Sequence, residues 1–169
     1  KTEAEAADRL FLYPAHSFAL PGATVGFSLK ATDANYVATS LPSRLSWSSN
    51  YGTLGSNSLT LDAAAGGSIS EATVTVKSDG MSGRASITVL KEVTGITVTK
   101  EDGKTKVKAL HVPGESDVQL AAAATYYGRS VISAANSFTW ETTGGVGSIT
   151  QDGKFTAASV SKLTEGTIK

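Results

Sequence analysis

Histidine is the side chain that most often acts as a general base near neutral pH, and it is also a common metal ligand. The chain has two histidines, His16 and His111, and each precedes a Pro-Gly turn at an equivalent place in the sequence. General-base catalysis needs a partner within hydrogen-bond reach. Neither histidine has an acidic residue at the spacing of a metal site, so we predict structural or surface roles for both.

The aspartates do not gather into a metal site. Calcium binding usually requires several oxygen ligands from one densely acidic loop, and no loop of this sequence is that acidic. Asp79, Asp102 and Asp152 each stand before a glycine, a pair that is typical of tight turns. The chain has no cysteine, which excludes disulfides, thiolate ligands and cysteine nucleophiles. We predict no metal site and no cofactor.

Other reactive motifs are also missing from the sequence. No serine stands in a nucleophile-elbow pattern, and no glycine-rich loop lies between a strand and a helix, as phosphate binding would need. The glycine-rich run at residues 144–147 lies between two predicted strands, which indicates a turn. The sequence therefore predicts no catalytic residue and a protein that is not an enzyme.

Tyr126, Tyr127 and Arg129 are the candidates for ligand contact. They flank Gly128 in a stretch that we predict to be a loop. Tyrosine offers a ring for stacking and a hydroxyl for hydrogen bonding, a combination favoured at binding sites. The alternative is that they are loop residues without a ligand.

The two tryptophans, Trp47 and Trp140, also admit two interpretations. Each could stack on a sugar. Each also has an apolar residue two positions earlier, Leu45 and Phe138 respectively, and this alternation places the indole on the buried face of a strand. We predict that both tryptophans are core residues.

The stretches around the tryptophans form an internal repeat. Residues 45–54 and 138–149 share one order: an apolar residue, a small polar residue, the Trp, a polar turn, a glycine and a short apolar step. Both copies also have alternating strand patterns on either side of this stretch. The sequence thus predicts an all-β fold of two tandem β-sandwiches.

The opening of the first copy predicts a strand at residues 10–13 that ends at Pro14 and continues over residues 16–20. A proline in a strand belongs at an edge or a bend, so we predict an opening strand split between two sheets. Residues 25–29 alternate as one half-buried strand, and residues 33–44 form a polar connection.

The rest of the first copy predicts a short strand at residues 59–61 and a small-residue loop at residues 63–67. Residues 72–77 and 85–89 predict strands. Asp79-Gly80 between them is a strong hairpin signal, because glycine accepts positive φ without steric cost.

The second copy repeats this order. Residues 96–98 open it, residues 101–104 form a turn, and residues 107–111 continue the opening strand. Residues 118–122 predict the next strand. Residues 125–137 then form a connection that leads to a strand containing the second tryptophan.

These patterns divide the chain into a linker or upstream tail at residues 1–9, a first sandwich at residues 10–91 and a second at residues 92–169. The second copy lacks the counterpart of residues 76–89 and hence its last strand. Natural sheets avoid or protect an unpaired edge, so we expect a fragment of a longer protein. The alternative is that a neighbouring chain supplies the strand by β-augmentation.

The charge balance limits the possible partners. Fifteen basic residues cancel fifteen acidic ones, and charged residues make up 18% of the 169. The sequence has no basic stripe that would attract nucleic acid. No apolar run approaches the ~20 residues of a membrane span. We therefore expect neither nucleic-acid binding nor direct membrane insertion.

Several short motifs in a fixed order resemble one known family. They lie at residues 21–24, 45–49, 83–89, 95–98, 113–116, 138–140 and 152–157. Together they resemble the bacterial immunoglobulin-like domains of group 2, the intimin/invasin type found in tandem on cell-surface proteins. The first copy departs from this pattern after its Trp turn, where residues 55–58 replace an Asp-Gly pair.

The resemblance implies two tandem immunoglobulin-like sandwiches in a larger bacterial cell-surface or secreted protein. Such domains act as non-catalytic spacer and adhesion segments. Their partners would be other domains of the parent protein, a cell-surface polysaccharide or a host protein, and their location would be extracellular. An alternative is a carbohydrate-binding accessory region of a polysaccharide-active or phosphodiester-glycosidase-type enzyme.

Overall fold

The computed structural model describes residues 6–63, 69–134 and 137–169. All the regular secondary structure in these ranges is β-strand, so the predicted all-β fold is confirmed. Most of the predicted linker (residues 1–5) and most of the predicted small-residue loop (residues 64–67) lie outside the described residues.

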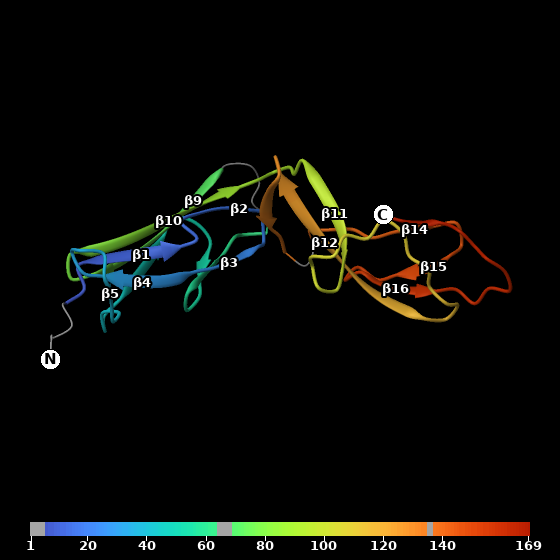
Figure 1. Cartoon of the computed structure of the whole chain (residues 1–169). Helices are drawn as coiled ribbons and strands as arrows, with labels where there is room; N and C mark the ends of the chain where they lie inside the picture. The colour runs from blue at the N-terminus through green and yellow to red at the C-terminus, as the bar shows by residue number, and fades with distance from the viewer. Residues whose placement is uncertain (1–5, 64–68, 135–136) are drawn as a thin grey trace. The chain divides into compact units, whose positions relative to one another are not determined.

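The chain divides into two compact units. Unit 1 comprises Lys1–Glu92 together with Val131–Ala134, and unit 2 comprises Val93–Ser130 and Ala135–Lys169. In Figure 1 the strands of unit 1 run from blue to green, apart from the short segment that the later part of the chain contributes. The sequence repeat predicts residues 131–134 in the second sandwich, whereas they group with the first unit.

In the ranges that the structure describes, unit 1 contains ten strands from the first part of the chain and the end of an eleventh. The ten strands are β1 (Arg9–Tyr13), β2 (His16–Ala19), β3 (Thr24–Gly26), β4 (Ser28–Thr32), β5 (Ala38–Thr39), β6 (Ser46–Ser49), β7 (Thr53–Leu54), β8 (Ser58–Thr60), β9 (Glu71–Ser78) and β10 (Met81–Val89). The eleventh is β13 (Arg129–Ile132), in which Val131 pairs with Phe18 of β2.

The opening strand of unit 1 is split between two sheets, as predicted. β1 pairs antiparallel with β4, whereas β2 pairs parallel with β10. The break falls at Pro14, which follows a cis peptide bond. Proline lacks the amide hydrogen that would continue the ladder, so the chain changes neighbours at this residue.

The core of unit 1 lies between these sheets. Alternation along β9 buries Ala72, Val74 and Val76 in turn. The largest fully buried aliphatic side chains of unit 1 are Val25, Leu59, Leu61, Val74, Val76 and Ile87. Burying one such side chain contributes about 1.5–3 kcal/mol, so these strands are held together mainly by apolar packing.

In unit 1 the predicted hairpin is confirmed, and the predicted polar connection is wrong in part. Asp79 and Gly80 both have positive φ, at 43° and 82°, and they join β9 to β10 as the predicted hairpin. The connection predicted at residues 33–44 is wrong in part, because it contains β5, which pairs with β4. The alternation of apolar residues in this stretch is too short to have shown a strand.

The strand predicted at residues 25–29 is divided in two. β3 pairs with β8, and β4 pairs with β1, so the backbone changes partner near Phe27. The predicted faces are right, because Val25 and Phe27 are buried and Lys30 is exposed. Periodicity reports which face is buried, and it carries no information on which strand lies alongside.

Among its described residues, unit 2 has six further strands. They are β11 (Gly95–Lys100), β12 (Asp117–Tyr126), β14 (Thr142–Thr143), β15 (Gly147–Ile149), β16 (Lys154–Ala157) and β17 (Thr167–Ile168). β12 pairs with both β11 and β16, and β15 pairs with the other edge of β16.

The two units repeat the same strand registers. In unit 1, Ser49 of β6 pairs with Val74 of β9. In unit 2, Thr142 pairs with Ile168, and these two residues hold the same positions in the sequence repeat. The backbone amide of Asp8 donates to the carbonyl oxygen of Thr32 at 2.8 Å, and that of Thr94 donates to Thr125 at 3.0 Å. The internal repeat read from the sequence is therefore also a repeat of backbone pairing.

Two strand predictions in unit 2 are wrong. The described residues 107–111 form no strand, because Ala109 and His111 are both exposed and the segment has no buried face. Trp140 also lies outside a strand. Its amide donates to Gln151 Oε1 at 3.3 Å, and Gln151 Nε2 donates to its carbonyl at 3.1 Å. The side-chain amide of Gln151 thus forms the backbone hydrogen bonds with Trp140 that a neighbouring strand would form.

Gly153 lies in the turn before β16, where the backbone leaves little space for a side chain. Its φ is +89°, and an added Cβ would stand 2.5 Å from the carbonyl oxygen of Leu120. Gly103 has φ +68° and open space around the same position. We expect Gly153→Ala to lower the free energy of unfolding by about 3 kcal/mol or more, because strain and overlap add, and Gly103→Ala by only about 1–2 kcal/mol. Denaturant titration of both variants measures the difference, and equal losses would contradict this packing.

Candidate functional site

The predicted ligand-contact residues surround a tight turn rather than an open loop. Tyr126 ends β12, Arg129 begins β13, and Tyr127-Gly128 connects the two strands with φ of 46° and 79°. Tyr127 is 78% exposed, and its ring packs edge-on against Tyr126 with centroids 4.6 Å apart. Its amide donates to Thr94 Oγ1 at 2.7 Å. The structure thus presents one tyrosine ring to solvent on a well-anchored turn.

The predicted core residues differ from one another in burial. Trp140 is 8% exposed. Trp47 is half-buried and packs against the core cluster of unit 1. Neither indole lies in an exposed position that would favour stacking on a sugar.

Neither histidine forms an ion pair with a carboxylate in the part of the chain that the structure describes. His16 is exposed on β2, and its Nδ1 is 2.7 Å from Ser86 Oγ of β10. The two residues are direct cross-strand partners. A serine–histidine pair could activate a nucleophile only with a third group to orient the imidazole, and no carboxylate in the described residues forms an ion pair with His16. Their bond is therefore a link between two strands.

A group of aromatic and cationic side chains on β1, β4 and the following turn was missed by sequence analysis. Arg9, Phe11 and Tyr13 alternate along β1 with Leu10 and Leu12, which are buried. The first three therefore share the outer face of the sheet. The alternation was present in the sequence, but the stretch was interpreted only as an apolar strand.

The contacts on this face pair each exposed ring with a cation. The Arg9 guanidinium lies 4.5 Å from the centroid of the Tyr36 ring, and Lys30 Nζ lies 5.8 Å from that of Tyr13. The rings of Phe11 and Tyr36 are 6.3 Å apart. Tyr36 is 65% exposed and Tyr13 is 49% exposed. We call Arg9, Phe11, Tyr13, Lys30 and Tyr36 the aromatic face.

The turn between β4 and β5 holds Tyr36 in position. Asp33, which is 7% exposed, accepts hydrogen bonds at Oδ1 from the amides of Asn35 at 2.8 Å and Val37 at 2.9 Å. The Tyr36 amide donates to the Asp33 carbonyl at 3.1 Å. Tyr36 itself has φ 64°, a conformation that costs a non-glycine residue about 1–2 kcal/mol. The turn therefore places a large ring in solvent at an energetic cost.

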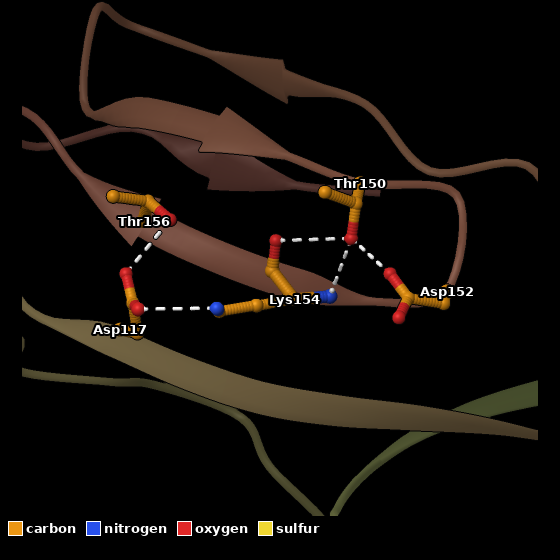
Figure 2. A network of polar contacts seen from close by, with 5 residues as sticks. All are labelled: Asp117, Thr150, Asp152, Lys154 and Thr156. Atoms are coloured by element: carbon orange, nitrogen blue, oxygen red, sulfur yellow. Dashed lines mark hydrogen bonds and ion pairs between the residues drawn. The ribbon is translucent and has the colours of Figure 1, made fainter.

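Unit 2 carries a polar network between β12 and β16 (Figure 2). Thr156 Oγ1 donates to Asp117 Oδ1 at 2.8 Å, and Lys154 Nζ is 3.3 Å from Asp117 Oδ2. Across the next turn, the Thr150 hydroxyl donates to Asp152, and the Lys154 amide donates to Thr150 Oγ1 at 3.1 Å. These are neighbouring contacts along one strand pair, and they fasten its register.

Hydrogen bonds to these carboxylates lower their pKa. The Thr156 hydroxyl lowers the pKa of Asp117, and the Thr150 hydroxyl lowers the pKa of Asp152. In the turn after β11, the side-chain hydroxyl of Thr105, then the amides of Thr105 and Lys104, lower the pKa of Asp102 from 3.8 to about 2. All three groups are exposed, and they act as structural acceptors in turns and strand pairs.

The acid sensitivity of unit 2 follows from these shifts. A carboxyl whose pKa is lower in the folded chain stabilises the fold above the unfolded pKa, and the contribution is lost as pH falls through the folded pKa. For Asp102 this window runs from 3.8 down to about 2. We expect Thr105→Val to raise the pKa of Asp102 towards 3.8 in an NMR titration. Thr156→Val should raise the pKa of Asp117 and leave Asp102 unchanged. If Asp102 titrates identically in both variants, the Thr105 hydroxyl is not the cause.

A hollow of about 790 Å³ opens beside the β9–β10 hairpin in unit 1. It is lined by residues 43–46 and 77–82, which supply Arg44, Lys77 and Asp79 as charged groups and contain no histidine. In the described ranges, no three His, Cys, Asp or Glu residues are grouped so that they could hold a metal ion. Likewise, none of the described segments forms a helix long and apolar enough to span a membrane.

Comparison with known proteins gives distant structural likenesses. No protein-family model and no curated protein matches the chain. Domains 5–6 of the S-layer protein SbsC share 16% identity at a TM-score of 0.40, with 98% of this chain and 90% of that chain covered. Domains 4–9 of the same protein share 15% identity at a TM-score of 0.39, covering 97% of this chain and 29% of that one. TM-scores below 0.5 do not define a common fold, so the fold described above rests on this chain's own strand pairing.

Proposed function

We propose that this chain is a non-catalytic, load-bearing spacer segment of a larger bacterial cell-surface or secreted protein. The single observation that carries the proposal is the parallel pairing of β2 with β10 in unit 1. The motifs shared with bacterial immunoglobulin-like domains support the surface location. The work of such a segment is to remain folded while tension passes along the chain.

Parallel pairing of an early strand with a late strand determines how tension acts on unit 1. The chain enters through β1 and β2 and leaves through β10, so pulling on the two ends draws β2 and β10 in opposite directions along their common axis. The bonds of the ladder are then loaded together, in shear. Ser86 N donates to the Ala15 carbonyl at 2.9 Å and Leu90 N to the Ala19 carbonyl at 2.9 Å, which brackets the loaded stretch.

Side chains reinforce the same pair of strands. The His16–Ser86 contact of 2.7 Å joins β2 to β10 on their exposed side. On the core side, Ala19, Ile87 and Val89 are buried. Sliding β2 along β10 would therefore break the backbone ladder and this cross-strand bond and would expose apolar surface at the same time.

Single-molecule force spectroscopy of the whole chain tests the spacer function. The absence of cysteine allows handles to be attached at chosen pairs of positions. Handles at Asp8→Cys and Lys91→Cys load β2 and β10 in shear. Handles at Ala15→Cys and Arg84→Cys pull apart the end of the ladder at the His16–Ser86 pair, so that bonds break one after another.

We expect the force that unfolds unit 1 to be several-fold higher in the shear geometry at the same loading rate. His16→Ala, which removes the cross-strand bond to Ser86, should lower the force in the shear geometry. Denaturant unfolding of both double-cysteine variants controls for a general loss of stability. Equal forces in the two geometries would overturn the load-bearing role.

A second candidate function, a carbohydrate-binding accessory region, is favoured by one observation. Tyr36 and Tyr127 are large, exposed rings, and both are held at positive φ, where asparagine or glycine would fold at lower cost. A binding screen of the folded chain against a polysaccharide panel tests this function. Saturable binding of at least one polysaccharide is the expected result, and its absence across the panel would remove this candidate.

A further inference from the structure

We propose that the aromatic face of unit 1 is a binding platform for an acidic polysaccharide. The inference rests on the second candidate function and names its site and ligand class. The five residues of the aromatic face come from two paired strands and one turn of the same unit. Phe11 of β1 lies directly opposite Lys30 of β4 in the register, so rings and cations alternate across the sheet.

The rings supply the saccharide-binding element of the platform. A sugar ring has faces of C–H groups that pack on an aromatic ring, and the tyrosine hydroxyl can hydrogen-bond to sugar hydroxyls. Tyr36 is 65% exposed to solvent, and Tyr13 is 49% exposed. The Arg9 guanidinium and the Phe11 ring lie against Tyr36 and hold its orientation.

The charges on the platform favour an acidic ligand over a neutral one. Arg9 and Lys30 are the cations of the face. Asp8 Oδ2 is 3.9 Å from Arg9 Nε, and among the described residues no carboxylate forms an ion pair with Lys30. Arg9 Nε is buried and makes no hydrogen bond, whereas the Arg9 side chain as a whole is 42% exposed. A ligand carboxylate would therefore be bound through the terminal Nη donors of the guanidinium, and arginine binds carboxylates in a bidentate manner. A chain of uronic acids combines that carboxylate with stackable sugar rings.

The strain at Tyr36 is an independent indication of function. Asparagine and glycine adopt positive φ at low cost, whereas tyrosine does so rarely. The Asp33 hydrogen bonds hold this turn without using the Tyr36 side chain. A costly residue whose side chain does not support the local fold is expected where the side chain serves binding. The equivalent turn of unit 2 also presents a tyrosine at positive φ, Tyr127.

The decisive variant is Tyr36→Asn in the full chain. Asparagine suits the backbone conformation, so the free energy of unfolding should stay equal or rise, which separates binding from folding. The probe is polygalacturonate, and binding is measured by calorimetry or affinity electrophoresis. We expect Tyr36→Asn to weaken binding at least about tenfold, and Tyr36→Phe, which keeps the ring, to stay within about threefold. Lys30→Gln should weaken binding and reduce its dependence on salt.

Two matched ligands and one matched variant define the outcomes. Methyl-esterified polygalacturonate keeps the sugar rings and loses the charge, and polyglutamate keeps the charge and loses the rings. We expect both to bind more weakly than polygalacturonate; equal binding of either would overturn the assigned ligand class. Leu163→Ala, at an exposed apolar side chain of unit 2 that takes no part in either candidate site, should leave the affinity unchanged. If the panel reveals binding that Tyr36→Asn does not alter, the platform is wrong while the carbohydrate-binding function stands. If nothing binds, both fail.

Discussion

The parallel pairing of β2 with β10 is the constraint on which the rest of unit 1 depends. Antiparallel neighbours can be joined by a tight turn, whereas parallel neighbours need a long connection between them. Here the connection is most of the unit, from residue 20 to residue 80. Closing it requires the opening strand to leave the β1–β4 sheet at Pro14 and cross to the other sheet. The core between the sheets is enclosed only when that crossing is made.

The same arrangement accounts for where function can reside. Most buried residues on both sheets are aliphatic, and the described residues provide no convergent set of acid, base and nucleophile. Polar chemistry is confined to turns and outward faces. The hydrogen-bonded aspartates Asp102, Asp117 and Asp152 hold turns and strand register. The surfaces that could bind a ligand are therefore the outer face of β1 and the two equivalent turns that expose Tyr36 and Tyr127.

The load-bearing function and the ligand-binding function depend on different residues of unit 1. Load resistance comes from the inner pairing of β2 and β10, and ligand binding comes from the outer residues of β1 and β4. β1 precedes β2 in the chain, so tension reaches Arg9, Phe11 and Tyr13 before it reaches the β2–β10 ladder. The His16–Ser86 bond and the Arg9–Tyr36 contact are local to their own strands. Variants of either one should therefore affect the other function little.

The sequence by itself determined the all-β class, the internal repeat, the Asp79-Gly80 hairpin and the split at Pro14. Each depends on a local rule: alternation, positive φ at glycine, or the missing amide of proline. Strand partners depend on distant residues, so the sequence did not show that residues 25–29 serve two sheets. Local patterns also did not reveal that Gln151 bonds the backbone of Trp140 in place of a strand.

Burial shows most directly what only the tertiary structure decided. Leu10 and Ile96 hold equivalent positions in the repeat and have similar side chains. Leu10 is 4% exposed, and its backbone passes within close contact of Gly83 in β10. Ile96 is 62% exposed in unit 2. Tyr36 is likewise ambiguous in the sequence between a loop residue and a ligand contact, and only the fold brings Arg9 and Phe11 beside it. Alternation predicts which way a side chain points, and the packing of distant strands decides whether anything covers it.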